Sequence, residues 1–147
     1  HPADGQSAIT VTTREKAAEL SEDANVSIQV MSYGYARTKK AHMAMAVAPA
    51  SQMALDGANI KAGDLSAVKT HNPFASNDLY LAKTIGLDVE TMNNYGSSLI
   101  FGHPQGPTFA RLTMEGIEEL ALKGGGYLLV AGCAAGDTAA AIVLKVG

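Results

Sequence analysis

Gly102-His103-Pro104-Gln105-Gly106 is a bend in which glycines and a proline flank a histidine, directly ahead of a helix-like run. Further along comes Cys133, the only cysteine of the chain. An imidazole titrates near neutrality, and a thiolate is both a strong nucleophile and a usable proton carrier. The two side chains therefore favour acid/base or nucleophilic chemistry, which requires that the fold bring them to one place.

Composition limits the kind of protein that can carry these residues. The 147 residues suffice for one ordinary domain with a hydrophobic core. Hydrophobic residues make up 47% and charged residues 17%, which is typical of a folded chain. The net charge is -3 and the basic residues are scattered, so no broad basic face for nucleic acid or an anionic membrane is expected. No apolar run reaches membrane-spanning length, and the sequence predicts a soluble protein.

The cysteine content and the ends of the chain add three expectations. One cysteine cannot form an intramolecular disulfide and no signal peptide is visible, so a reducing, cytoplasmic setting is expected. The chain opens at His1 rather than Met, which indicates a piece of a longer protein. The small basic cluster of Arg37, Lys39 and Lys40 is interpreted as a solvated loop or helix start rather than an anion site.

Hydrophobic periodicity and breakers predict strands that alternate with helices. Strands are expected over 7–12, 26–30, 65–70, 127–131 and 139–146, and helices over 14–20, 41–55, 74–85 and from Gly106-Pro107 to the Gly124-Gly125-Gly126 stop. Pro49 predicts a kink in the second helix or a later start. The last two strands are expected to be antiparallel, with Cys133, Gly136 and Asp137 in the turn between them. This pattern predicts layered α/β architecture, with residues 21–25 as the best boundary.

Three elements of this layout lie at strand ends or loops, where sites of α/β folds concentrate. They are His71-Asn72-Pro73-Phe74, Gly102-His103-Pro104 and Cys133. Each also has a purely structural interpretation: His71 as a helix cap, His103 as a hydrogen-bonded turn residue, Cys133 as a small buried hydrophobe. Taken singly, the residues leave both interpretations open.

Taken together and in this order, the elements resemble the C-terminal half of a thiolase, the family that makes or cleaves 3-oxoacyl-CoA thioesters. Thiolases carry an Asn-or-His-x-x-Phe block, then Gly-His-Pro-x-Gly, then a cysteine with a glycine-rich turn; here these are residues 71–74, 102–106 and 133–136. The opening residues 2–8 resemble the strand that ends the thiolase N-terminal domain. The resemblance implies a layered mixed β-sheet with helices on both faces, with residues 1–24 ending the N-terminal domain and residues 25–147 forming the C-terminal one.

The resemblance also implies a role for each residue in Claisen condensation. Cys133 takes the place of the base that removes a proton from the α-carbon of a thioester. His103 activates the nucleophilic cysteine and donates to the thioester oxygen as the enolate forms, and His71 holds the water that completes this oxyanion hole. The backbone N–H of Ala135 belongs to a second oxyanion hole. Phe74 is expected near the pantetheine arm of coenzyme A, and Gly102 is expected among the substrate-binding residues.

Three segments depart from the family pattern. The turn after the cysteine is Ala134-Ala135-Gly136-Asp137-Thr138, in which the carboxylate of Asp137 would raise the pKa of the thiol if it lay close, and otherwise turns to solvent. Residues 93–97 lose an Asn and a Gly of the usual pattern, and residues 107–109 replace Ala-Ser-Gly. These changes leave the expected fold intact, but the sequence does not determine which substrate is used.

The nucleophilic cysteine of a thiolase belongs to the N-terminal half, and Cys133 is the only cysteine here. The preferred interpretation is thus the C-terminal catalytic half of a CoA-dependent acyltransferase, completed by an N-terminal thiolase domain in the same chain or a partner. An acyl-CoA thioester is expected as substrate, with no bound cofactor and no metal, and a homo-oligomer is expected for the full-length protein. The alternative is a non-catalytic thiolase-like subunit or a CoA- or lipid-binding module.

Overall fold

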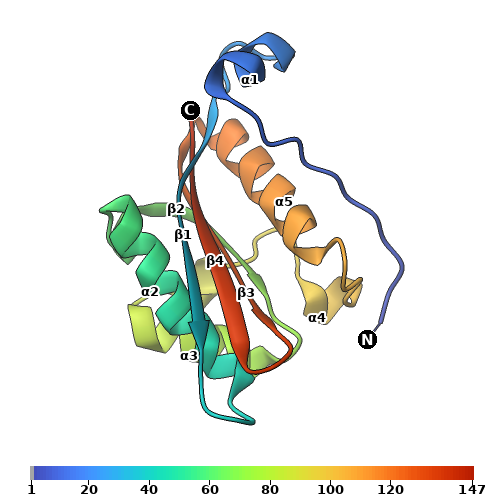
Figure 1. Cartoon of the computed structure of the whole chain (residues 1–147), viewed down its shortest axis with the longest axis vertical. Helices are drawn as coiled ribbons and strands as arrows, with labels where there is room; N and C mark the ends of the chain where they lie inside the picture. Colours follow the sequence, from blue (N-terminus) through green and yellow to red (C-terminus); the bar gives the residue numbers. More distant parts are fainter. Residues whose placement is uncertain (1) are drawn as a thin grey trace.

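A mixed four-stranded sheet forms the centre of the molecule, as the computed structural model of residues 2–147 shows (Figure 1). The strand order is β1-β4-β3-β2, with bounds β1 Ile28–Arg37, β2 Leu65–His71, β3 Gly126–Ala134 and β4 Thr138–Val146. β4 runs antiparallel to both β1 and β3, whereas β2 and β3 are parallel. The expected antiparallel pairing of the last two strands is confirmed.

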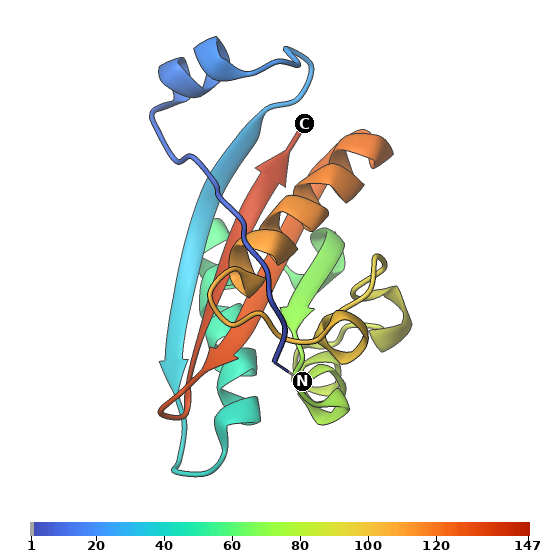
Figure 2. The same ribbon diagram turned by 90° about the vertical axis from the view of Figure 1, so that its right-hand side faces the viewer.

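Helices cover both faces of this sheet, as the fold prediction requires (Figures 1 and 2). α2 (Val47–Ala58) and α3 (Ala75–Ile85) lie on one face, and α5 (Thr108–Lys123) lies on the other. Successive side chains of a strand point to opposite faces. In β3, Leu129 and Ala131 therefore join the α2 core, while Leu128 and Val130 join the α5 core.

A glycine fixes how closely α2 lies on the sheet. A Cβ built on Gly34 of β1 would stand 2.0 Å from the carbonyl oxygen of Ala50 and 2.8 Å from the backbone nitrogen of Ala54. No real Cβ makes such contacts, so the helix backbone approaches the strand backbone directly. Both alanines are fully buried, which leaves no adjacent space into which the helix can shift.

The start of the chain departs from one expectation. Residues 7–12 were expected to form a strand, which is wrong: they run extended along the molecule with no ladder partner and are mostly exposed (Figure 2). The β-branched residues favour extension, but no neighbouring strand offers hydrogen bonds. The expected helix 14–20 is confirmed as α1 (Arg14–Leu20), capped by Thr13, and none of its residues is buried. His1 lies outside the described residues.

The remaining elements match with shifted ends. The helix expected over 41–55 starts late, because a 3₁₀ turn (Met43–Ala46) precedes α2 and Pro49 falls in the first turn, where its missing N–H costs little. β1 begins at Ile28 and continues to Arg37, well past the expected strand. The short helices η2 (Ala62–Asp64), η3 (Val89–Thr91) and α4 (Ser98–Phe101) complete the chain. Among residues 2–147, no helix combines the length and the apolarity needed to cross a bilayer.

Cys133 is placed differently from the expectation. The sequence placed it in the turn before β4, which is wrong, because β3 runs through Ala134 and Cys133 pairs with Ala139 of β4. The run of small residues in both strands allows the ladder to continue past the expected end, and the turn is confined to residues 135–137.

Candidate functional site

Two imidazoles stack at the carboxyl end of the parallel strand pair. His71 is the last residue of β2, and His103 follows the short helix α4. Their ring centroids are 4.0 Å apart at an interplanar angle of 26°. His71 is 7% exposed and His103 is partly exposed, so the pair presents one imidazole toward the surface and one inside. The fold thus joins two motifs that are far apart in the sequence.

The hydrogen bonds of His103 select its tautomer. Its Nδ1 lies 3.0 Å from Oγ1 of Thr108, and that hydroxyl donates its own proton to the carbonyl of Pro104 at 2.8 Å. A hydroxyl has one proton to donate, so Nδ1 carries the proton that Thr108 accepts. The neutral ring therefore has its lone pair on Nε2. Burial lowers the pKa of His103, which keeps this nitrogen available as a base near neutral pH.

His71 is held neutral more strongly. Its burial lowers the pKa to about 4, and the charges of His103 and of Arg111 on α5 add to the effect. Nδ1 of His71 lies 3.1 Å from Oγ of Ser98, the first residue of α4, which fixes the ring orientation. A neutral imidazole retains one N–H donor and one acceptor, as a group that binds water or an oxyanion requires.

Cys133 lies beside this pair but on the other face of the sheet. Gly132 is the strand partner of His71, and a Cβ on Gly132 would be 3.0 Å from the Cβ of His71. Because side chains alternate, Cys133 points to the face covered by α2 and α3, where it packs against the core. Its Sγ accepts a hydrogen bond from Nδ2 of Asn77 on α3 at 3.6 Å. Burial raises the pKa of the Cys133 thiol, while this hydrogen bond lowers it.

A buried carboxylate anchors the end of β2. Asp78 of α3 accepts hydrogen bonds from the hydroxyl of Thr70 and from the carboxamides of Asn72 and Asn93. Oδ1 of Asn93 in turn accepts from the backbone N–H of Thr70 at 2.8 Å. Burial raises the pKa of Asp78, and the three donors oppose that shift. This network fixes the residues on both sides of His71, and it gives Asn93 a structural role.

An ion pair supports the same strand from the α5 face. Nζ of Lys69, a fully buried side chain of β2, lies 2.7 Å from Oε2 of Glu119 on α5. Lys123 and the amide of Asn94 bind the other oxygen of Glu119, and the Lys69 ammonium lies 4.4 Å from the centroid of the Tyr95 ring. These contacts tie the loop before α4 to the strand that carries His71.

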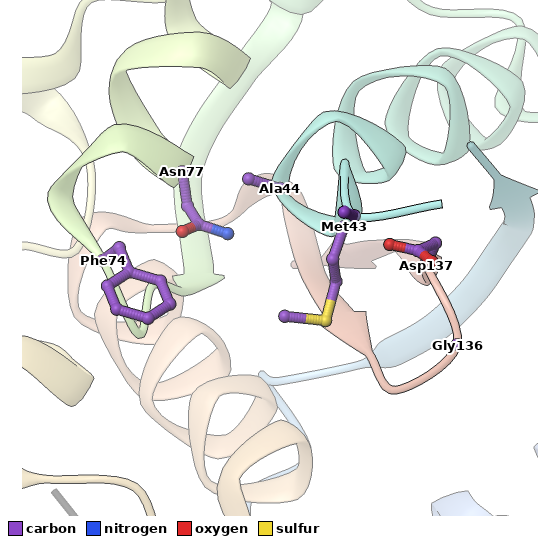
Figure 3. Close-up of a pocket in the computed structure, with 7 residues that line it drawn as sticks. Met43, Ala44, Phe74, Asn77, Gly136 and Asp137 are labelled. Carbon is purple, nitrogen blue, oxygen red and sulfur yellow. The ribbon is translucent and has the colours of Figure 1, made fainter. Parts of the chain in front are cut away.

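A pocket of about 410 Å³ is lined by Asn77 of α3, the hydrogen-bond partner of Cys133, and by the β3–β4 turn (Figure 3). Phe74, Met43 and Ala44 provide apolar walls, and the carboxamide of Asn77 projects into the space between Phe74 and Met43. Asp137 lines the opposite side, where its Oδ1 accepts from the backbone N–H of His42 at 3.1 Å. Asp137 therefore holds the loop that contains His42, and it neither binds the thiol nor turns freely to solvent.

The other two predicted residues lie in bends around the site. Gly102 is buried at the end of α4 with φ of 79°, a left-handed conformation that favours glycine and turns the chain into the His103 bend. Ala135 is exposed at the tip of the β3–β4 turn, and its carbonyl accepts from the hydroxyl of Thr138.

Sequence reasoning missed the residues that support the predicted ones. Asn77, Asp78, Ser98 and Thr108 all contact a predicted residue or its neighbour through a polar side chain. Asn77 and Asp78 are polar residues on the buried side of a helix, and this helical pattern was the available signal. Ser98 and Thr108 begin helices and are indistinguishable in sequence from ordinary capping residues.

Comparison with known proteins shows which family has this fold and these motifs. The family model described as thiolase, C-terminal domain matches residues 24–146. The chain belongs to the thiolase family. Relatives include a 3-ketoacyl-CoA thiolase of Aliivibrio fischeri, 34% identical with 97% of this chain and 36% of the relative covered. Another is the beta-ketothiolase BktB of Cupriavidus necator, 30% identical with 94% and 35% covered.

Solved thiolase structures match the fold as well. The acetyl-CoA acetyltransferase of Bacillus anthracis superposes with a TM-score of 0.82 at 27% identity, covering 92% of this chain and 34% of that one. Human mitochondrial 3-ketoacyl-CoA thiolase, solved in complex with CoA, gives 0.78 at 25% identity, covering 82% and 30%. The chain therefore spans about a third of the length of the thiolases it matches.

Proposed function

We propose that this chain is the C-terminal part of a thiolase that condenses or thiolytically cleaves acyl-CoA thioesters, and that residues 1–24 end its N-terminal domain. The observation that carries the proposal is the stacked pair of His71 and His103 at the strand end beside Cys133. The largely exposed residues 2–24, with no buried position in α1, support the domain division. The single cysteine supports a reducing, cytoplasmic setting.

The roles follow from the chemistry of each group. In the condensing direction, the Cys133 thiolate forms an S–H bond with the α-proton of a thioester, and the C–H electron pair passes into the enolate. The enolate attacks an acyl group held on a cysteine of the N-terminal domain, and that cysteine leaves as a thiolate. Nε2 of His103 accepts the proton when the nucleophile is activated, and then donates it as a hydrogen bond to the thioester oxygen. Neutral His71 binds the water that provides the second donor.

The surrounding residues account for binding of the thioester. The apolar walls of the pocket that Asn77 lines, Phe74 among them, suit the pantetheine arm of coenzyme A. The N–H of Ala135 supplies a donor from the turn after β3, and Gly102 allows the bend that carries His103. No metal or resident cofactor is part of this mechanism, and full activity requires the N-terminal domain. We propose a homo-oligomer for the full-length protein, as is usual for such enzymes.

The test is a thiolysis assay on the full-length protein with a 3-oxoacyl-CoA substrate. Cys133→Ala and His103→Ala should each lower kcat by about a hundredfold or more, the range of a lost acid/base group. Gln52→Ala, an exposed change on α2, is the control and should keep full activity. Unchanged rates in both site variants would refute the roles assigned to them.

The separation of the site across two faces favours one second candidate, a CoA-binding subunit without turnover. In that case, the sulfur of Cys133 would serve only to hold Asn77, and the imidazoles would act only in binding. Calorimetry with coenzyme A separates the two functions. Binding by a full-length protein that shows neither thiolysis nor condensation would establish the second candidate and exclude the first.

A further inference from the structure

The environment of the Cys133 sulfur contains a polar residue that the mechanism above does not use. Asn77 of α3 is 2% exposed and directs its Nδ2 at Sγ of Cys133, 3.6 Å away. Among the described residues, its Oδ1 is buried and has no hydrogen-bond partner. The same residue lines the pocket between Phe74 and Asp137 (Figure 3). A buried carboxamide with one end on a thiol and the other unpaired requires an explanation.

An unsatisfied buried amide oxygen destabilises the fold, so an apolar residue would suit this position better for stability alone. The advantage of asparagine at this position must come from its Nδ2, which faces the sulfur of Cys133. An N–H donor stabilises a thiolate more than a neutral thiol, because a hydrogen bond to a charged acceptor is roughly twice as strong. This contact therefore opposes the effect of burial on the thiol, which otherwise raises its pKa.

We propose that Asn77 is a positioning residue for Cys133, holding the sulfur at the pocket and favouring its thiolate form. The inference rests on the proposed function for its catalytic meaning, but the contact itself does not depend on it. When the thiolate accepts the α-proton and becomes a thiol, a half-turn of the carboxamide presents Oδ1 to the new S–H. An asparagine thus has a group suited to either protonation state, which neither leucine nor aspartate has.

The two carboxylates on the elements next to this thiol already have partners. Asp78, the next residue of α3, is bound by Thr70, Asn72 and Asn93. Asp137, in the turn after β3, binds the backbone of His42. β4 contributes only Ala139 opposite Cys133. Asn77 is therefore the polar side chain from the packed elements that acts directly on the sulfur.

The experiment measures the alkylation of Cys133 by iodoacetamide in the full-length protein as a function of pH, read by mass spectrometry of the peptide that contains it. This readout follows one sulfur and needs no turnover. Asn77→Leu, which keeps the branch at Cγ in a larger side chain and lacks the donor, should raise the apparent pKa by about one unit and slow alkylation below that pKa about tenfold. Asn77→Asp should raise it further, because it adds a negative charge beside the thiolate.

A matched control removes another side-chain amide of the same site region. Asn94→Ala loses the hydrogen bond to Glu119 on the α5 face and should leave the alkylation profile of Cys133 unchanged. In the thiolase assay, Asn77→Leu should lower kcat with little change in KM. If Asn77→Leu does not fold, Asn77→Ala, which removes the donor without added bulk or charge, gives the same test.

The outcomes separate this inference from the proposed function. A lower melting temperature with an unshifted alkylation profile would mean that Asn77 is merely structural, and would overturn the proposal. A shifted profile in a full-length protein without thiolase activity would support the contact and refute only the enzyme function. A shifted profile together with a lowered kcat supports both.

Discussion

The buried ion pair of Lys69 and Glu119 gives the sharpest test of how the fold holds its site. The perturbation is Glu119→Gln, which removes a charge that is 2% exposed and leaves the fully buried ammonium of Lys69 without its counterion. The hydrogen bond from Asn94 retains an acceptor in the glutamine, so the change isolates the charge. Breaking a buried pair from one side typically costs about 3–5 kcal/mol.

The titration of Glu119 gives a second route to the magnitude. Burial raises the pKa of Glu119. The hydrogen bonds from Lys123, Lys69 and Asn94 and the charge of Lys69 lower it by more, so that the pKa falls from an ordinary 4.5 to about 2. That difference corresponds to about 3 kcal/mol, taken as an upper value because Lys123 is half exposed and solvent screens its share. The two routes agree on a loss of about 3 kcal/mol in Glu119→Gln.

Urea denaturation of the chain, followed by circular dichroism, measures this loss. Glu118→Gln, on the exposed side of the same helix, is the control and should change the free energy of unfolding by less than about 0.5 kcal/mol. The double variant Lys69→Met/Glu119→Leu should recover most of the loss, since apolar residues replace both charges.

The pH dependence has a definite sign. Because the folded pKa of Glu119 is depressed, its contribution is fully present above pH 4.5 and is lost as the pH falls through about 2. The difference between the wild-type chain and Glu119→Gln should therefore be constant from pH 7 to 5 and shrink at lower pH. A loss below about 1 kcal/mol at pH 7, equal to that of Glu118→Gln, would refute the reasoning.

Three further changes test the packing and the site. Gly34→Ala should destabilise the chain by about 2 kcal/mol or more, because its Cβ would overlap the α2 backbone, whereas Gly63→Ala, with open space around it, should leave the melting temperature unchanged. The depressed pKa of His71 predicts that stability falls as the pH drops from 6.5 to about 4, where the unfolded chain binds the proton first; His71→Asn should remove this slope from urea titrations. Asp78→Ala should cost about 2 kcal/mol in urea denaturation, since three donors lose their acceptor; a cost under about 0.5 kcal/mol would contradict the anchoring role.

Much of the architecture follows from local signals in the sequence. Gly86 and Gly124 predicted the ends of α3 and α5, and both end their helices in a left-handed conformation. Pro49 delays the start of α2, as expected. The β-branched residues 7–12 misled because strand formation depends on a partner strand, which local composition does not reveal. The end of β3 was missed for the same reason, since it depends on register with β4.

In the candidate site as well, local motifs could be predicted from the sequence, whereas contacts between distant residues could not. The motifs identified His71, His103 and Cys133, but only the three-dimensional pairing of His71 with Gly132 shows that alternation places Cys133 on the other face. The tautomer of His103 depends on Thr108, and the thiol depends on Asn77; each relation joins residues through space. Side-chain contacts of this kind carry no local pattern, so the sequence predicts the participants but not their arrangement.

The placement of His71 and Cys133 on opposite faces has a consequence for access. Under the proposed function, a thioester that reaches both would cross the rim of the sheet where β2 and β3 end, with its reacting carbon above the strand ends rather than over either layer. The rim then acts as a ridge that divides two half-sites, one built on α5 and the other on α3. Asp78 of α3 and Glu119 of α5 each bind β2, so the strand end holds the two halves at a fixed separation. Under the proposed function, the fit of the acyl group would therefore respond to changes in packing on either side of the sheet, far from the reacting atoms.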